Sequence, residues 1–83
     1  MIYTGLDPRG YFTITLLKDV GKIRVGYMNT NNKEIEAWES DDVKELSNLI
    51  QIYISDISHA LYMGRELMRA KQCLITGDEY KQD

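Results

Sequence analysis

The fold is decided by residues 34–50, EIEAWESDDVKELSNLI, because the spacing of the apolar side chains changes within this stretch. Up to Ser40 apolar and polar residues alternate, which is the period of a half-buried strand. After Ser40 the apolar residues recur at steps of three and four, which is the period of a helix. The sequence therefore predicts an α+β fold, with a strand region followed by a helical region.

Three strands are expected before this change of period. They span Tyr11–Leu17, Ile23–Met28 and Glu34–Glu39. The side chains expected to face the core are Phe12, Ile14 and Leu16, then Ile23, Val25 and Tyr27, then Ile35 and Ala37. Trp38 is expected to face outward. The connections are short and rich in turn formers: Asp7–Gly10, Asp19–Gly21 and Asn29–Asn32. Short turns between successive strands predict an antiparallel meander.

The helical region begins at Ser40-Asp41-Asp42, which supplies N-cap candidates, and Asp42 has capping-box spacing to Glu45. One apolar stripe then runs through Val43, Leu46, Ile50, Tyr53, Ile57, Ala60, Gly64, Leu67, Lys71 and Leu74. We expect two helices, with a break at Asp56-Ile57-Ser58, where Asp56 or Ser58 caps the second helix, and an end at Gly77. The alternative is one helix of about 34 residues, roughly 50 Å long, since no Gly or Pro enforces the break.

Length and composition limit the class of protein. The 83 residues predict one domain, with a β-meander over 1–39, helices over 40–77 and a polar tail over 78–83. A chain of this size has a thin core, and the lone Cys73 provides no disulfide, so we expect a homodimer. A free cysteine and the absence of a signal peptide or a long apolar run predict a soluble, cytoplasmic protein. The net charge of −3 argues against nucleic-acid binding.

The stretch HALYMGRELMRAKQCLITGDEYKQD, residues 59–83, holds the candidate site. His59 falls in the first turn of a helix, where a neutral imidazole could bind a ligand donor or could serve the helix start alone. Arg65 and Arg69 are four apart and could form a guanidinium fork for a carboxylate or phosphate. The plainer alternative is a solvated surface on which Glu66 and Arg69 form an ordinary ion pair.

Gly64 is unusual because glycine inside a helix costs about 1 kcal/mol relative to alanine. Ala60 and Gly64 share a face, together with Leu67. Small side chains allow close approach, so we expect this face to pack against the sheet, the first helix or a second protomer.

Other site classes are not indicated. The acidic residues between Glu34 and Glu45 spread over a strand, a turn and a helix start, which is a poor arrangement for a metal ion. The sequence has no phosphate-binding glycine loop, no nucleophile motif and no Cys/His cluster. We therefore predict no catalytic residue, no metal and no cofactor.

Two stretches resemble a known family: DPRGYFTI, residues 7–14, and the stretch 59–83 quoted above. The family is an uncharacterised archaeal and bacterial domain that follows pterin-binding, dihydropteroate-synthase-like domains. It also occurs in proteins labelled as related to one component of tetrahydromethanopterin S-methyltransferase. The matching residues are Asp7, Pro8, Gly10, Tyr11, Phe12, His59, Ala60, Tyr62, Gly64, Arg65, Glu66, Leu67, Ala70, Tyr80, Gln82 and Asp83. Met63, Arg69 and Lys71 depart from the family pattern. The resemblance implies a link to one-carbon metabolism, and we expect a stand-alone copy of the domain.

The expected function is that of a small, non-catalytic accessory domain that dimerises and docks on a protein of pterin- or corrinoid-dependent methyl transfer. The alternative is a protein that binds a small anionic or pterin-like molecule, or a minor enzyme. The site of this alternative would comprise His59, Tyr62, Arg65 and Glu66, closed by Tyr80, Gln82 and Asp83. It requires the tail to fold back beside the helix.

Overall fold

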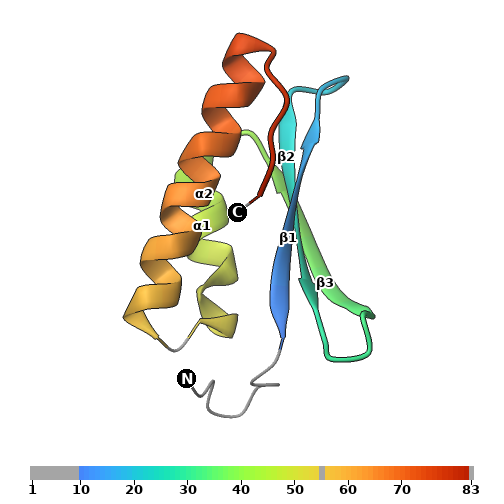
Figure 1. Cartoon of the computed structure of the whole chain (residues 1–83), viewed down its shortest axis with the longest axis vertical. Coiled ribbons are helices and arrows are strands. Elements are labelled where there is room, and N and C mark those ends of the chain that lie inside the picture. Colours follow the sequence, from blue (N-terminus) through green and yellow to red (C-terminus); the bar gives the residue numbers. More distant parts are fainter. Residues whose placement is uncertain (1–9, 55, 83) are drawn as a thin grey trace.

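The computed structural model describes residues 10–54 and 56–82 of the chain. Its elements are β1 (Tyr11–Leu17), β2 (Lys22–Met28), β3 (Glu34–Ser40), α1 (Val43–Ile50), the 3-10 helix η1 (Gln51–Tyr53) and α2 (Ile57–Thr76). The strands form one antiparallel sheet in the order β1-β2-β3, and the helices cover one of its faces (Figure 1). The predicted α+β meander followed by two helices is confirmed.

The turn between β2 and β3 depends on asparagine, as the sequence predicts. The Asn29 side chain accepts hydrogen bonds from the backbone N–H groups of Asn31 and Lys33, at 2.9 and 3.0 Å. Asn32 adopts a left-handed conformation with φ 59°, which asparagine tolerates better than most residues. The predicted turn at Asp7–Gly10 lies largely outside the described residues.

The prediction for β3 is wrong about which face is buried. Val25 pairs with Trp38 and Ile23 with Ser40, so Trp38 and Ser40 lie on the core side of the sheet. Trp38 is partly buried against the core, whereas Ile35 is 52% exposed. A register shift at Tyr27/Met28 accompanies this pairing. Pairing with β2 therefore decides the buried face, and a large indole fits it.

The helices start where carboxylates cap them. Asp42 accepts from the backbone N–H groups of Lys44 and Glu45, and Asp56 accepts from that of Ser58. The two-helix prediction is thus confirmed, with Asp56 as the second N-cap. The continuous stripe is wrong at Ile57, which is 77% exposed. The extended backbone at Ile54 and Asp56 resets the helical phase, since neither residue has helical dihedral angles.

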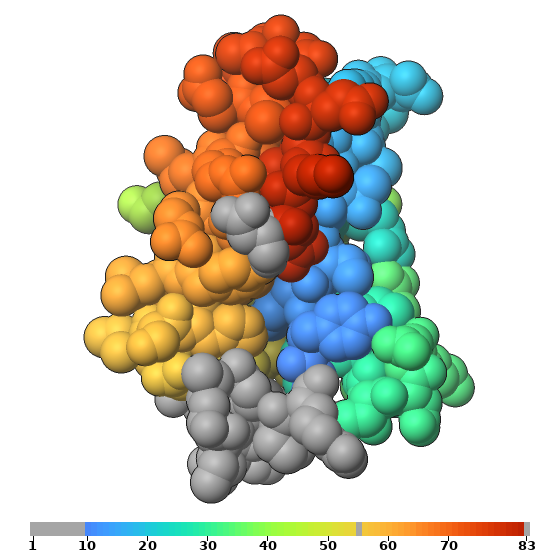
Figure 2. Space-filling view, viewed as in Figure 1, coloured from blue at the N-terminus to red at the C-terminus, as the bar shows by residue number. Residues whose placement is uncertain are grey.

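The core lies between the sheet and the helices. Its fully buried side chains include Ile23, Leu46, Ile50, Met63 and Leu67. Gly77 ends α2 in the left-handed conformation, with φ 83° and its N–H bonded to Cys73 O at 2.9 Å, as predicted. The chain then reverses and runs between α2 and β1 (Figure 1). In the space-filling view this segment fills the groove between the helix and the strand (Figure 2).

Candidate functional site

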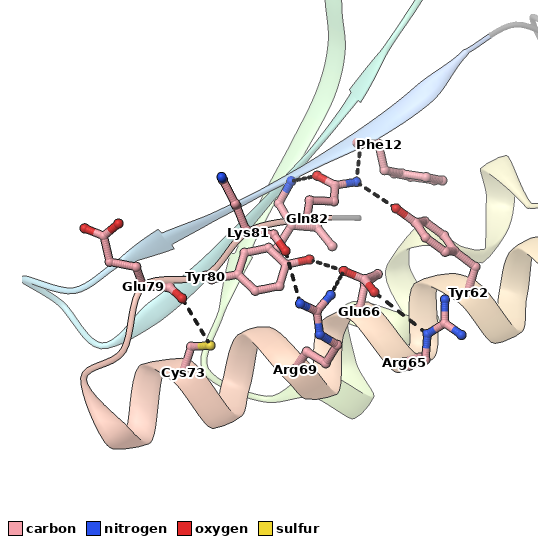
Figure 3. A network of polar contacts seen from close by, with 11 residues as sticks. Phe12, Tyr62, Arg65, Glu66, Arg69, Cys73, Glu79, Tyr80, Lys81 and Gln82 are labelled. Atoms are coloured by element: carbon pink, nitrogen blue, oxygen red, sulfur yellow. Dashed lines mark hydrogen bonds and ion pairs between the residues drawn. The ribbon is translucent and has the colours of Figure 1, made fainter.

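One face of α2 holds the C-terminal segment. Four side chains on this face, spaced by three or four residues, each contact one of four consecutive residues near the end of the chain (Figure 3). The contacting pairs are Cys73–Glu79, Glu66–Tyr80, Arg69–Lys81 and Tyr62–Gln82. We call these eight residues the tail latch. It brings the two parts of the stretch 59–83 together.

Glu66 lies at the centre of the tail latch. Its side chain is 0% exposed, and its Oε1 accepts from Tyr80 Oη and from Arg69 Nη1, each at 2.6 Å. Burial and the hydrogen bond to Glu66 raise the pKa of Tyr80 well above its ordinary value. A buried carboxylate is stable only when charged and polar partners surround it. The prediction of a solvated surface pair at Glu66 is therefore wrong.

The two arginines converge on this carboxylate. Arg69 Nη2 donates to the carbonyl oxygen of Lys81 at 3.2 Å, and its guanidinium lies 5.5 Å from the centre of the Tyr80 ring. Arg65 Nε lies 3.8 Å from Glu66 Oε2, while its side chain is 66% exposed. Both guanidiniums thus approach a carboxylate of the same chain, and a fork that binds a ligand stays a prediction.

Gln82 fastens the segment to the edge of the sheet. Its Nε2 donates to the carbonyl oxygen of Phe12 at 2.9 Å, and its Oε1 accepts from the N–H of Ile14 at 3.0 Å. A residue of a parallel neighbouring strand would make the same pair of hydrogen bonds. The side-chain amide therefore covers part of the open edge of β1.

His59 lies beside the tail latch among aromatic rings. Its ring centre is 5.4 Å from that of Phe12 and 6.3 Å from that of Tyr62. Burial lowers the pKa of His59, while the nearby Asp56 carboxylate acts in the opposite direction. The imidazole is therefore neutral at pH 7 and packs as an aromatic ring.

The aromatic contacts continue across the molecule, which the sequence did not suggest. Phe12 contacts Tyr27 at 5.2 Å, Tyr27 stacks on Tyr53 at 4.2 Å, and Tyr53 contacts Trp38 at 5.9 Å between ring centres. Tyr53 Oη also donates to Glu36 at 2.8 Å, and this hydrogen bond raises the pKa of Tyr53. These residues come from four different elements, so no spacing in the sequence links them.

Comparison with known proteins identifies the family of this chain. The sequence model of the family described as PterinBD-DUF4346 matches residues 6–83. The chain belongs to this family. Its description links the domain to pterin-binding domains. No curated protein and no solved structure gives a significant match.

In this PterinBD-DUF4346 domain the predicted ligand-binding residues do gather. His59, Tyr62, Arg65, Glu66, Tyr80 and Gln82 all belong to the tail latch or border it. The tail folds back beside α2, as the small-molecule alternative requires. Asp83 lies outside the described residues. The contacts given above join these side chains to one another and to β1.

The three residues predicted to form one packing face lie in different environments. Leu67 is 0% exposed and belongs to the core, while Ala60 is partly buried. A Cβ built on Gly64 would meet no atom within 4 Å among the described residues beyond its own helix. The sheet and α1 therefore do not approach Gly64, and a second protomer at this face stays a prediction.

Other features of the described residues bear on ligand classes. A depression of about 220 Å³ lies between β1 and the tail and includes Leu16, Lys18 and Glu79 in its lining. Small-molecule sites usually enclose about 300–1,000 Å³, so this depression is small for one. A second depression, whose lining includes Leu17 and Val20, has about 560 Å³ and falls within that range. Within residues 10–54 and 56–82, no three His, Cys, Asp or Glu side chains gather as metal ligands. The helices in those ranges lack the length and apolar character of a membrane span.

Proposed function

We propose that this domain is a non-catalytic accessory domain that associates with itself and docks on a pterin-binding protein of methyl transfer. The observation that carries the proposal is the tail latch. Glu66, Arg69 and Tyr80 are the groups best suited to acid–base or ion-binding chemistry, and each is engaged in holding the C-terminal segment. A set of polar groups bound to one another and buried stabilises a fold and leaves little for a substrate.

The exposed apolar side chains support an interaction role. On α2 alone, Ile57, Leu61, Met68 and Ile75 are 64–77% exposed. Single exposed apolar residues are ordinary on a soluble protein, but several along one helix form a surface suited to another protein. The thin core of a domain this small adds to the argument, since association buries further apolar surface.

The family supports the choice of partner. Its description joins this domain to pterin-binding domains, so a protein that carries such a domain is the partner to test first. We extend this to methyl transfer in the cytoplasm, where the lone Cys73 would remain reduced.

Affinity capture from the native host tests the proposal. The bait is the tagged domain, and the bound proteins are identified by mass spectrometry. We expect enrichment of a protein with a pterin-binding domain, followed by reconstitution of the complex from the two purified proteins. A matched bait carrying Val20→Glu, which changes an exposed apolar residue in the turn between β1 and β2, should capture the same partner. Failure of the purified pair to associate would refute the docking proposal.

A second candidate function rests on the partly buried rings of His59 and Tyr62 and on the exposed Arg65 beside them. The Arg65 guanidinium lies 5.9 Å from the centre of the Tyr62 ring and is largely exposed. Two rings and a cation are suited to a planar, anionic heterocycle, through stacking and charge. This candidate makes the domain a small-molecule binding protein.

Fluorescence titration with pterin-6-carboxylate distinguishes the two candidates. The binding function predicts saturable quenching of the pterin by the wild type and a weaker response with Arg65→Ala. Arg24→Ala, which removes a cation of the sheet, is the matched control and should leave the response unchanged. Absence of saturation in the wild type would eliminate the second candidate and leave the accessory role.

A further inference from the structure

The outward face of α2 carries a regular apolar surface. Ile57, Leu61, Gly64, Met68 and Ile75 follow one another at intervals of four, three, four and seven residues, so they share one face of the helix. The four large side chains are 77, 70, 64 and 69% exposed in chain order. We call these five residues the outer stripe. On the same helix, Met63, Leu67 and Ala70 are buried in the core.

Gly64 lies near the middle of the outer stripe, is partly buried, and has open space where a Cβ would lie. No atom of the sheet or of α1 lies within 4 Å of the position that its Cβ would take. Glycine lowers helix stability relative to alanine, because it loses more backbone freedom on folding. The missing side chain instead leaves a notch between Leu61 and Met68 on an exposed apolar surface.

We propose that the outer stripe is a homodimer interface, in which α2 of a second copy crosses antiparallel with the Gly64 notches facing each other. This inference rests on the proposed self-association and names its surface. Leu61 lies about one turn before Gly64 and Met68 about one turn after it. When the helix is reversed, Leu61 of one copy faces Met68 of the other. A two-fold interface requires such self-complementarity, whereas binding to a different protein does not require it.

The area of the outer stripe agrees with a weak, specific dimer. Burying one large aliphatic side chain removes roughly 80–100 Å² from water, so four of them in each of two copies remove roughly 700 Å². The backbone around Gly64 and the stems of neighbouring side chains add to this. The sum approaches the ~1,000 Å² at the lower limit of specific interfaces, so dimerisation should depend on concentration in the micromolar range.

The charges beside the outer stripe do not oppose the crossing. Arg65 borders it, and its Nε is 3.8 Å from the buried Glu66 carboxylate of the same chain. Lys71 falls between Met68 and Ile75 at the same helical spacing, and its Nζ donates to the carbonyl oxygen of Asp41 at 2.6 Å. Each of these two cations therefore already has a polar partner within its own copy.

Sedimentation equilibrium of the full chain tests the interface. Four proteins are compared: wild type, Met68→Glu, Gly64→Leu and, as the control, Val20→Glu. Met68 and Val20 are 64 and 62% exposed, so the two glutamates replace apolar residues of similar exposure on different surfaces. We expect a micromolar monomer–dimer equilibrium for the wild type and for Val20→Glu. Met68→Glu and Gly64→Leu should each weaken it at least tenfold, because each change occurs twice in a two-fold interface.

Gly64→Leu separates a crossing of two copies from a flat apolar contact. At a flat contact the added leucine would increase apolar area and strengthen association, whereas at the notch it blocks close approach. Circular dichroism confirms that each variant is folded, and Leu61→Glu replaces Met68→Glu should the latter not fold.

Three results would overturn the interface. These are a wild type that stays monomeric at about 1 mM, a dimer that survives both α2 changes, and equal loss with Val20→Glu. A monomeric wild type that still binds a pterin-binding protein would remove this interface while leaving the docking part of the proposed function intact.

Discussion

Removing the Tyr80 hydroxyl should destabilise the fold more than the loss of an equivalent surface hydroxyl. Tyr80→Phe deletes the 2.6 Å hydrogen bond to the fully buried Glu66 carboxylate. Hydrogen bonds to charged groups contribute about 1.5–3 kcal/mol. Because Arg69 still donates to the same oxygen, we expect a loss in the lower part of this range, about 1.5–2 kcal/mol. For a domain of this size that lowers the Tm by about 6–16 °C.

Tyr53→Phe is the matched control for this change. It also removes a tyrosine hydroxyl from a glutamate, at 2.8 Å, but the acceptor Glu36 is exposed. Water replaces the lost donor there, so we expect a loss below about 0.5 kcal/mol. Urea unfolding of the wild type and both variants at pH 7 and 25 °C measures the difference. Equal losses in the two variants would refute the argument that burial of Glu66 sets the contribution of Tyr80.

The same bond has a pH dependence of known sign. Burial and the bond to Glu66 raise the pKa of Tyr80 above its ordinary value of 10.0. The stabilisation is therefore complete below pH 10 and is lost as the pH rises from 10 through the raised pKa. The difference in unfolding free energy between wild type and Tyr80→Phe should stay constant from pH 7 to about 9 and shrink above pH 10.

Three further predictions follow from the packing. His59 is the chain's single histidine, so NMR titration should give one imidazole curve with a midpoint below 6.5, and Asp56→Asn should lower this midpoint further. The free energy of unfolding should fall as the pH drops from 6.5 towards the lowered pKa of His59. A midpoint at or above 6.5 would contradict the burial of the ring. Gly10→Ala should lower the free energy of unfolding in urea by about 1–3 kcal/mol, since the added Cβ would overlap the buried Tyr27 ring. The control Gly64→Ala should stabilise the monomer by up to about 1 kcal/mol. Equal effects of the two changes would argue against the overlap. Gln82→Ala should speed hydrogen exchange at the Ile14 amide about tenfold, because that amide donates to Gln82. Gln72→Ala, at an exposed site, should leave the Ile14 rate unchanged. An unaltered Ile14 rate in Gln82→Ala would show that the Gln82 amide does not protect the β1 edge.

Local patterns predicted most of the secondary structure. The strands and the starts of both helices follow from alternation, short turns and polar residues placed before apolar runs, all of which act over a few residues. The structure selects Asp42 and Asp56 from the N-cap candidates. The buried face of β3 did not follow, because either face of EIEAWES offers apolar side chains. Pairing of Trp38 with Val25 decided it.

The candidate site was predicted as a set of residues but not as a structure. Helical spacing placed Tyr62, Glu66 and Arg69 on one face of α2, and their partners could not be read from spacing. Tyr80 lies 14 residues from Glu66, and Gln82 lies 70 residues from Phe12. The sequence predicts only a polar tail, whereas in the structure the Tyr80 hydroxyl and the Gln82 amide bind α2 and β1.

The sequence by itself determined the elements, their order and the class of fold, because those depend on period, turns and caps within short windows. Only the tertiary structure decided that Glu66 is buried, that the arginines bind a carboxylate of their own chain, and that Gly64 faces open space. The reason is physical: burial of a charge depends on partners that arrive from elsewhere in the chain. Because the break after η1 resets the helical phase, some apolar residues of α2 face the core and others are exposed.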